Sequence, residues 1–244
     1  MMFICLAALI CRLELPEPAL AWKVAWSRNC YRGWDQGSFS ECLSGRSPAR
    51  YSFVRDYCFG REWWNFFEGF SDRYYYGYAP PLHALRPRRL VSGGLVFFVS
   101  QDRLRVWHVV GMYCNVDIVV RPPHLNLWAT VPGGCRGKVP GYVVRSLKTP
   151  PNLLLRASKE CSMPLPKPMP IDMYRDLGVK GLGKASFTYL DLGSVFRLLG
   201  SIRVFVEGLR VLRGGELCVD VDRAVKVLHN VGRRLEGLKG FAKQ

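Results

Sequence analysis

The chain has 244 residues, of which 49% are hydrophobic and 13% are aromatic, and this excludes a disordered tail. It is long enough for one large domain or two small ones with a substantial core. Its 35 Lys and Arg residues against 19 Asp and Glu residues give a net charge of +16, which favours a polyanionic partner. A generally basic proteome is the alternative explanation, and charge alone does not separate DNA, RNA and acidic membrane.

Nine cysteines are scattered along the chain without a C-x-x-C pair, and only four histidines accompany them. No zinc-ligand spacing is present, so no metal site is expected. An odd, unpatterned set is typical of small buried side chains in a reducing compartment, which predicts a cytoplasmic protein. Scarce glutamine points to a heat-adapted source, whereas the cysteine count points away from one.

Residues 1–20 are expected to form an N-terminal extension. Residues 1–10 are apolar, and Ala19-Leu20-Ala21 resembles a signal-peptidase site. However, no Lys or Arg precedes the apolar run, and ten residues are too few to span a bilayer. An extension upstream of the true start, or a strand, is therefore the preferred interpretation, with no membrane partner.

The first third of the chain combines extended and helical patterns. Residues 21–26 alternate and predict a strand, after which Ser27 or Asn29 can cap a short helix that reaches Cys42. The aromatic-rich residues 51–70 are expected to be partly helical. Residues 74–78 are expected to be extended up to Pro80.

The middle of the chain predicts an antiparallel meander. Residues 90–100 form a buried strand, a polar turn follows at Gln101-Asp102, and residues 106–113 and 116–120 form two further strands. Residues 125–131 and 141–146 are additional candidate strands. The prolines at positions 150, 151, 164, 166, 168 and 170 predict a linker or surface loop.

The C-terminal residues 191–244 predict a helical segment. Asp191 can cap a helix, although Gly200 and Gly208 leave a strand at residues 202–212 as an alternative. Asp220 or Asp222 can cap a last helix with one apolar stripe, made of Val221, Ala224, Val225, Leu228, Val231, Leu235 and Leu238. The expected fold class is α+β, with a β-barrel-like meander at residues 21–190, flanking helices and this helical end.

No catalytic motif is recognisable. The chain has no P-loop, G-x-S-x-G or H-E-x-x-H pattern, and residues 178–183 have the wrong glycine spacing for a dinucleotide loop. Lys180 and Lys184 in that turn can contact phosphate. No catalytic residue and no cofactor is predicted. The alternative is a nuclease or transferase whose acids meet at a strand end, drawn from Asp56, Glu62, Asp102, Asp117 and Asp191.

The positive signal is a set of Trp and Tyr residues interleaved with Arg in the first third of the chain. A flat aromatic side chain can stack on a nucleobase for about 1–3 kcal/mol, while arginines such as Arg28 and Arg32 contact phosphates. Two or three of these aromatics are expected to line a site, and the rest to pack in the core. Arg86, Arg88 and Arg89 predict a phosphate-binding ridge or, equally, a solvated loop.

The order of elements resembles EVE and YTH domains of the PUA-like superfamily, and especially the N-terminal specificity domains of archaeal McrBC-type restriction systems. The likeness covers residues 22–190. It depends on the strand at 22–26 with the following Ser27-Arg28-Asn29, Tyr75-Tyr76-Gly77-Tyr78, the strand at 90–100, Val109-Val110-Gly111-Met112-Tyr113 and the closing strand at 185–190. Gly94 stands where this family usually has Asp.

The resemblance implies a non-catalytic reader of DNA or RNA that flips a modified base into an aromatic pocket. Trp26, Ser27 and Asn29 would edge that pocket, Trp34 or Trp63 would stack on the base, and Asn115 would face it. Trp64 and Tyr76 complete the base-binding candidates. A restriction ATPase or nuclease subunit would be the partner. A structural subunit that docks through the C-terminal stripe is a further alternative.

Overall fold

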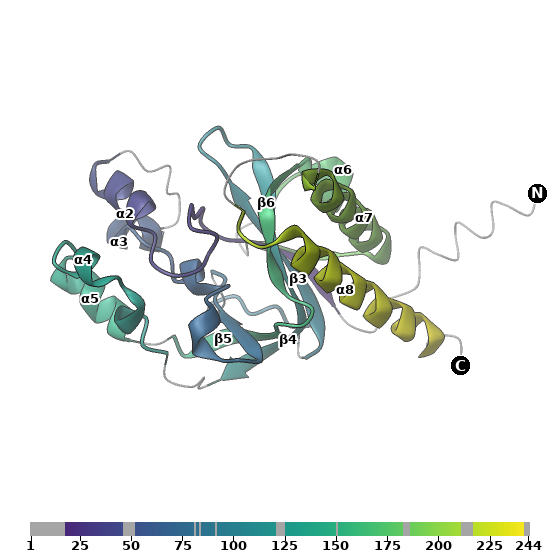
Figure 1. Cartoon of the computed structure of the whole chain (residues 1–244), viewed down its shortest axis with the longest axis horizontal. Helices are drawn as coiled ribbons and strands as arrows, with labels where there is room; N and C mark the ends of the chain where they lie inside the picture. The colour runs from purple at the N-terminus through teal and green to yellow at the C-terminus, as the bar shows by residue number, and fades with distance from the viewer. Residues whose placement is uncertain are drawn as a thin grey trace, which may run out of the picture.

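A mixed sheet lies between two layers of helices (Figure 1). The computed structural model describes residues 18–45, 52–80, 82, 84–90, 92–120, 125–149, 151–182, 186–210 and 217–241. In chain order the elements are β1 (Ala19–Lys23), α2 (Gln36–Leu43), α3 (Ser52–Tyr57), η1 (Arg61–Trp64), η2 (Glu68–Phe70), β2 (Tyr74–Gly77), β3 (Gly94–Gln101), β4 (Trp107–Val120), η3 (Trp128–Thr130), α4 (Gly133–Arg136), α5 (Gly141–Lys148), β5 (Leu153–Ser158), β6 (Met163–Ile171), α6 (Met173–Leu177), β7 (Phe187–Leu190), α7 (Leu192–Leu209) and α8 (Val221–Phe241).

Six of the seven strands form an open sheet in the order β2-β5-β4-β3-β1-β7, and the seventh, β6, pairs with β4 off this path. The long β4 pairs with β6 along its first half and with β5 along its second half. β1 pairs with β3 in parallel, and every other pair is antiparallel. The α+β class is therefore confirmed. The sheet is not closed among the described residues, so the expected barrel is not confirmed. The expected antiparallel pairing of residues 90–100 with the strand that follows is confirmed by β3 and β4, whereas the parallel β1–β3 pair was not expected.

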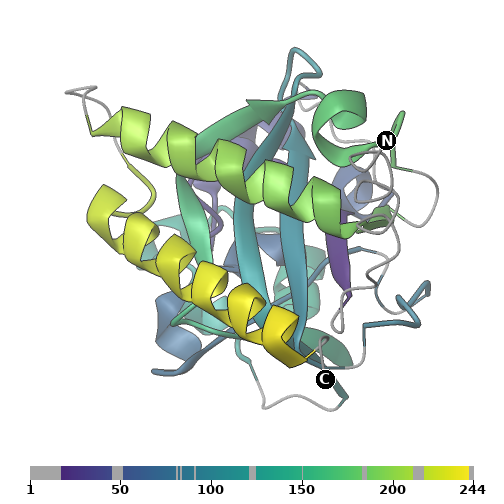
Figure 2. The ribbon, with the colours of Figure 1, turned by 90° about the vertical axis from the view of Figure 1, so that its right-hand side faces the viewer.

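The sheet separates two hydrophobic cores. In β1, Leu20 and Trp22 point into a core shared with α2, η1 and α5, whereas Ala19 and Ala21 point into a core shared with α6, α7 and α8. Helices that cover both faces leave no solvated side in the central strands, which explains the continuous hydrophobic run of β3. Figure 2 shows α7 and α8 lying across the second face.

The predicted pair of strands at 106–113 and 116–120 is wrong, because β4 runs through both as one strand. The register passes from Gly94 opposite Val116 to Leu95 opposite Cys114, so Asn115 is an extra residue between them. Asn115 has φ of +57°, as a bulged residue can, and the Arg234 guanidinium donates to its side-chain oxygen at 3.0 Å. The bulge interrupts the alternation that marks a strand in the sequence.

The predicted linker at the proline cluster is also wrong, because β5 and β6 occupy it. Pro164, Pro166, Pro168 and Pro170 lie within β6. A strand tolerates proline where no second neighbour needs the missing N–H, and β6 pairs with β4 alone. The carbonyl of Pro166 accepts from the Cys218 N–H at 2.8 Å on another segment.

Three local predictions in the first two-thirds of the chain are corrected. The candidate strands at 125–131 and 141–146 are helical, since η3 and α5 lie there and α5 buries Val143 and Leu147 at i, i+4 spacing. Asp35, and not Ser27 or Asn29, caps α2 by accepting from the Ser38 N–H. The first strand starts and ends earlier than expected, so Trp26 lies beyond it.

The two C-terminal helices are confirmed. Asp191 caps α7 by accepting from the Ser194 N–H at 2.6 Å, and Asp220 accepts from two N–H groups at the start of α8. The apolar stripe of α8 packs within the chain, because Val221, Ala224 and Val231 are buried in the second core. Among the helices of the described residues, none is long and apolar enough to cross a membrane.

Four of the nine cysteines form disulfides, so the prediction of small buried thiols is wrong for them. Cys42 bonds to Cys58, and Cys30 bonds to Cys218. The scattered positions concealed both pairs, because each joins segments that only the fold brings together. A sequence without a repeated cysteine spacing therefore does not exclude disulfides.

Candidate functional site

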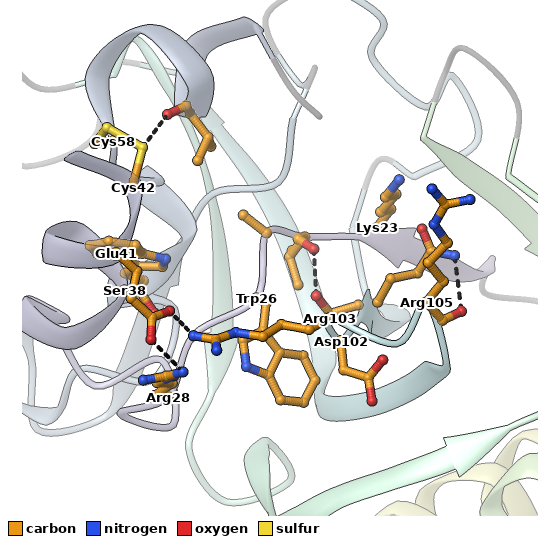
Figure 3. A pocket seen from close by; sticks show the side chains of 16 residues that line it. Lys23, Trp26, Arg28, Ser38, Glu41, Cys42, Cys58, Asp102, Arg103 and Arg105 are labelled. Carbon is orange, nitrogen blue, oxygen red and sulfur yellow. Dashed lines mark hydrogen bonds and ion pairs between the residues drawn. A yellow bond between two sulfur atoms is a disulfide. The ribbon is translucent and has the colours of Figure 1, made fainter. Parts of the chain in front are cut away.

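A cavity of about 340 Å³ lies beside the end of β1 (Figure 3). Its walls come from the end of β1 and the loop after it, from α2 and α3, from η1, and from the β3–β4 turn. Its volume is within the range of small-ligand pockets, which is roughly 300–1,000 Å³. Sixteen residues line it: Lys23, Val24, Ala25, Trp26, Arg28, Ser38, Glu41, Cys42, Val54, Cys58, Trp63, Ser100, Gln101, Asp102, Arg103 and Arg105.

One part of the cavity wall is apolar. It includes Val24, Val54 and Trp63, together with the half-buried indole of Trp26. The Trp26 ring meets the His108 ring edge-on, with 5.4 Å between their centroids. Because His108 is the second residue of β4, this contact packs the indole against the start of that strand. A partly exposed indole of this kind offers a flat face to a ligand.

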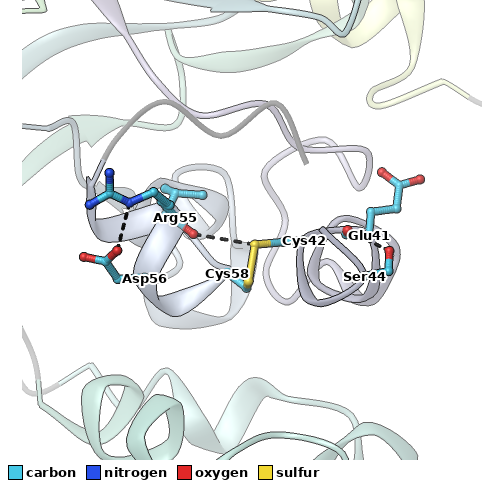
Figure 4. Close-up of a disulfide and its surroundings, with 7 residues drawn as sticks. Glu41, Cys42, Ser44, Arg55, Asp56 and Cys58 are labelled. Carbon is cyan, nitrogen blue, oxygen red and sulfur yellow. Dashed lines mark hydrogen bonds and ion pairs between the residues drawn. A yellow bond between two sulfur atoms is a disulfide. The ribbon is translucent and has the colours of Figure 1, made fainter. Parts of the chain in front are cut away.

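The disulfide between Cys42 and Cys58 forms another part of the wall (Figure 4). It joins α2 to α3, the two short helices that also carry Glu41 and Val54 to the cavity. Short helices of this length have little stability of their own, so a covalent link between them stabilises the wall.

The other part of the cavity is charged, and positive charge dominates. Lys23, Arg28, Arg103 and Arg105 line it with only two acids, Glu41 and Asp102. The Glu41 carboxylate contacts Arg28 at 2.7 Å and also pairs with Arg103, so one acid bridges two guanidiniums from opposite walls. The hydrogen bond from Arg103 is the main cause of a lowered Glu41 pKa.

The β3–β4 turn presents its arginines because Asp102 shapes it. The Asp102 carboxylate accepts from the Val106 N–H at 2.9 Å, and its backbone N–H donates to the Val106 carbonyl at 3.0 Å. Arg105 takes a left-handed conformation, with φ of +64°, and its N–H donates to the Asp102 carbonyl. The turn is thereby closed, and Arg103 and Arg105 remain exposed at its tip.

Ser27 and Asn29, predicted to edge a base pocket, hold the loop after β1 in shape. The Ser27 hydroxyl donates to the Asn29 side-chain oxygen at 2.7 Å, and the Asn29 amide donates to the carbonyls of Gly33 and Trp34. The Asp35 carboxylate accepts from the Arg28 N–H at 2.6 Å. These bonds fix where Arg28 and Trp26 leave the loop.

The structure brings only some of the predicted base-binding residues together. Trp26 and Trp63 line the cavity, but Trp63 is only 2% exposed and packs in the first core together with Trp34 and Trp64, which are 7% and 2% exposed. Of these four indoles, Trp26 alone is half-buried and accessible to a ligand. Tyr76 lines a separate hollow of about 10 Å³ next to Trp64. Asn115 is the bulged residue of β4 and contacts α8.

The predicted phosphate-binding residues are similarly divided. Arg28 lines the cavity, whereas Arg32 is exposed elsewhere in the same loop and does not line it. Arg86, Arg88, Arg89 and Lys180 are exposed on other segments. Arg89 lies over the Tyr189 ring at 4.8 Å and its N–H donates to the Tyr189 hydroxyl, which attaches its loop to β7. Lys184 lies outside the described residues.

Sequence reasoning missed Lys23, Glu41, Arg103 and Arg105. The turn that carries Arg103 and Arg105 was visible as polar, but polar turns occur in every hairpin. Nothing in the sequence indicates that this turn faces Arg28, since β1 and β3 become neighbours only through their parallel pairing.

Gly94 has a packing reason to be glycine. A Cβ atom at this position would lie 2.2 Å from a Leu90 methyl and 2.9 Å from the backbone oxygen of Pro18. An aspartate therefore does not fit here without displacement of the chain before β1.

The carboxylates proposed for an alternative catalytic site have separate local roles. Asp56 pairs with Arg55, Asp117 pairs with Arg156, and Asp191 caps α7. Glu62 is buried and accepts from the Ala25 N–H at 2.9 Å, and burial raises the pKa of its carboxyl. Within the described ranges, no group of three His, Cys, Asp or Glu side chains is arranged to hold a metal ion.

Comparison with known protein families, with curated proteins and with solved structures found no match to this chain.

Proposed function

We propose that this chain is a PUA-like nucleic-acid-binding protein that takes a flipped-out, modified base of DNA or RNA into the cavity beside Trp26. The observation that carries the proposal is the convergence of a half-buried indole and four cationic side chains on one cavity. A base needs a flat stacking surface, and the phosphates on either side of it need positive charge.

Stacking on Trp26 is the first part of the proposal. The His108 ring contacts the indole edge-on, so the indole has a supported orientation before a base arrives. Trp26 also lies three residues after the end of β1, and the loop bonds of Asn29 and Asp35 restrict the chain beyond it. Preorganisation of this kind lowers the entropic cost of binding.

Recognition of a modified base is the second part. Val24, Val54 and the Cys42–Cys58 disulfide give the cavity an apolar wall, which suits an added methyl or similar group better than a bare polar edge. Arg28, Arg103 and Arg105 stand at the charged wall, where they would bind the phosphates next to the flipped nucleotide.

The proposed function also implies a partner subunit and a cellular compartment. A chain without a P-loop would depend on a separate ATPase or nuclease subunit for any cleavage. A cytoplasmic location is part of the proposal, but the two disulfides remove the argument from reduced thiols. Intracellular proteins of hyperthermophiles are the class of cytoplasmic protein in which such disulfides occur.

A binding titration tests the proposal. Matched oligonucleotides, single- and double-stranded, DNA and RNA, with and without methylated or hydroxymethylated bases, are titrated at two salt concentrations. A preference for one modified base that persists at the higher salt concentration is expected, because stacking and shape depend less on salt than phosphate contacts do. The Trp26→Ala variant should lose that preference, whereas Tyr174→Ala, an exposed aromatic on α6, should keep it. Base-independent binding that collapses with salt would contradict the proposal.

A further inference from the structure

The segment between Asp117 and Glu160 contains no acidic residue at all. It carries seven Lys and Arg residues: Arg121, Arg136, Lys138, Arg145, Lys148, Arg156 and Lys159. A run of 42 residues, 118 to 159, with only one sign of charge is unusual for a surface that merely keeps a protein in solution, where both signs normally alternate.

Of these cations, three have local partners, three others have no ion pair among the described residues, and Arg121 lies outside the described residues. Arg156 pairs with Asp117 at 2.7 Å, Lys159 pairs with Glu68 at 2.7 Å, and Arg136 donates to two backbone carbonyls. In contrast, no carboxylate of the described residues lies within ion-pair distance of Lys138, Arg145 or Lys148.

All three cations are exposed: Lys138 lies in the connection between α4 and α5, and Arg145 and Lys148 lie on α5. α5 buries Val143 and Leu147, so Arg145 and Lys148 project from the opposite side of the helix. The helix dipole favours cations in the last turn and accounts for that pair. The dipole of α5 does not account for Lys138, which lies between the C-terminal end of the four-residue α4 and the positive N-terminal end of α5.

The backbone near these cations is rich in glycine and therefore carries few side chains. Gly133, Gly134, Gly137 and Gly141 each have open space where a Cβ would stand, and none has a positive φ. Neither packing nor backbone conformation therefore calls for glycine here, and glycine weakens short helices such as α4. What these glycines permit is the close approach of another molecule to the main chain.

The same elements adjoin the cavity. The Tyr142 ring in the first turn of α5 lies 5.7 Å from the ring of Tyr57, the last residue of α3. The next residue, Cys58, belongs to the cavity wall. Figure 1 shows α4 and α5 on the same side of the sheet as α2 and α3, and opposite to α7 and α8.

We infer that Lys138, Arg145 and Lys148, with the glycine-rich backbone of residues 133–141, form a second binding surface that holds the phosphodiester backbone of a nucleic acid. We call it the α4–α5 surface. It rests on the proposed function in that the nucleic acid whose base enters the cavity continues over it. Its contribution is independent of sequence, because phosphate contacts position a nucleic acid and do not read bases.

The salt dependence of binding measures this surface directly. For the variant Lys138→Ala/Arg145→Ala/Lys148→Ala we expect the slope of log Kd against log salt to fall by about 2–3 on duplex DNA and about 2 on single-stranded RNA. Affinity at low salt should fall by about tenfold or more. Parallel titrations on DNA and RNA show which backbone the surface binds.

A matched control removes three cations from the opposite layer: Arg203→Ala/Lys226→Ala/Arg233→Ala on α7 and α8. The control loses the same net charge as the first variant. Because its cations lie on the face opposite to the α4–α5 surface, the slope of log Kd against log salt should change by less than about 1. Equal slopes in the two triple variants, or an unchanged slope in the first, would overturn the inference. Thermal unfolding of both variants establishes that they are folded.

The two proposals fail separately in this design. A reduced slope in the α4–α5 variant of a protein that shows no base preference supports the surface and rejects the base reader. A base preference with an unaffected slope does the reverse. A wild-type protein that binds no nucleic acid rejects both.

Discussion

Cys30 and Cys218 lie 188 residues apart in the sequence and form a disulfide between the loop after β1 and the segment before α8. Cys30 belongs to the same loop as Trp26 and Arg28, and it takes a left-handed conformation with φ of +63°. The Cys218 N–H also donates to the Pro166 carbonyl of β6. The loop that lines the cavity is thus covalently joined to the helical layer on the far face of the sheet.

Removal of this long-range link should cost more than removal of the short-range one. A cross-link stabilises mainly by restricting the unfolded chain, which predicts about 5 kcal/mol for the 188-residue separation and about 3 kcal/mol for the 16-residue separation of Cys42 and Cys58. Denaturant unfolding of Cys30→Ser/Cys218→Ser and of Cys42→Ser/Cys58→Ser gives the two values. The chain can also be denatured without reduction, alkylated at its free thiols and weighed by intact-mass spectrometry. Labelling of all nine cysteines would contradict both disulfides.

Trp26 and Trp34 should respond oppositely to truncation. Trp34→Ala removes a buried indole that packs against Phe39 and Trp63, and it should lower the free energy of unfolding by about 3–5 kcal/mol. Trp26→Ala removes a half-buried indole and should change stability much less, but it should weaken binding of the preferred oligonucleotide by about 1–3 kcal/mol. Denaturant unfolding and a binding titration of each variant check the contrast. Equal stability losses would show that Trp26 is a core residue.

Neutralisation of Glu41 should strengthen anion binding. In the free protein its carboxylate pairs with Arg28 and Arg103, and a phosphate must displace it to reach both guanidiniums. Glu41→Gln should therefore lower the Kd for oligonucleotides by about two- to fivefold, which corresponds to a weak exposed ion pair. Glu207→Gln, which breaks the Arg203 pair on α7, is the control and should leave the Kd unchanged. A weaker Kd for Glu41→Gln would mean that this acid positions the arginines for the ligand.

Because of Glu62, we expect the free energy of unfolding to fall as pH rises. Burial raises the pKa of this carboxyl in the folded chain above its usual value of 4.5, so the folded state favours the protonated form. This contribution is fully present below the unfolded pKa and is lost as pH rises through the folded pKa.

The variant Glu62→Gln keeps an acceptor for the Ala25 N–H and carries no charge. It should equal the wild type near about pH 4 and exceed its stability by about 1–2 kcal/mol near about pH 8. Urea unfolding at both pH values tests this. A variant that is less stable at the higher pH would show that the ionised carboxylate is preferred in the core.

Strong hydrophobic and helix-capping patterns in the sequence were sufficient to predict part of the fold. The hydrophobic run of β3, the cap at Asp191 and the stripe of α8 each correspond to an observed element. Their patterns depend on local residues alone, so no distant contact can disguise them.

The missed features depend on contacts that are distant in the sequence. The bulge at Asn115 breaks the alternation of β4, and the prolines of β6 are compatible with a strand only because β6 has one neighbour. In the candidate site, Trp26 and Arg28 were predicted as a base-binding aromatic residue and a phosphate-binding residue, although Trp26 was expected at the end of a strand and lies in the loop after β1. Arg103 and Glu41 were not, because the parallel pairing of β1 with β3 is what places their elements opposite each other.

The prolines of β6 also affect how molecules of this protein behave at high concentration. An unpaired strand edge is a template onto which a strand of another molecule can add, and such addition begins many aggregates. Pro164, Pro166, Pro168 and Pro170 offer no N–H group to an incoming strand. The same residues that disguise β6 as a loop in the sequence therefore protect the folded protein against growth of its sheet from this edge.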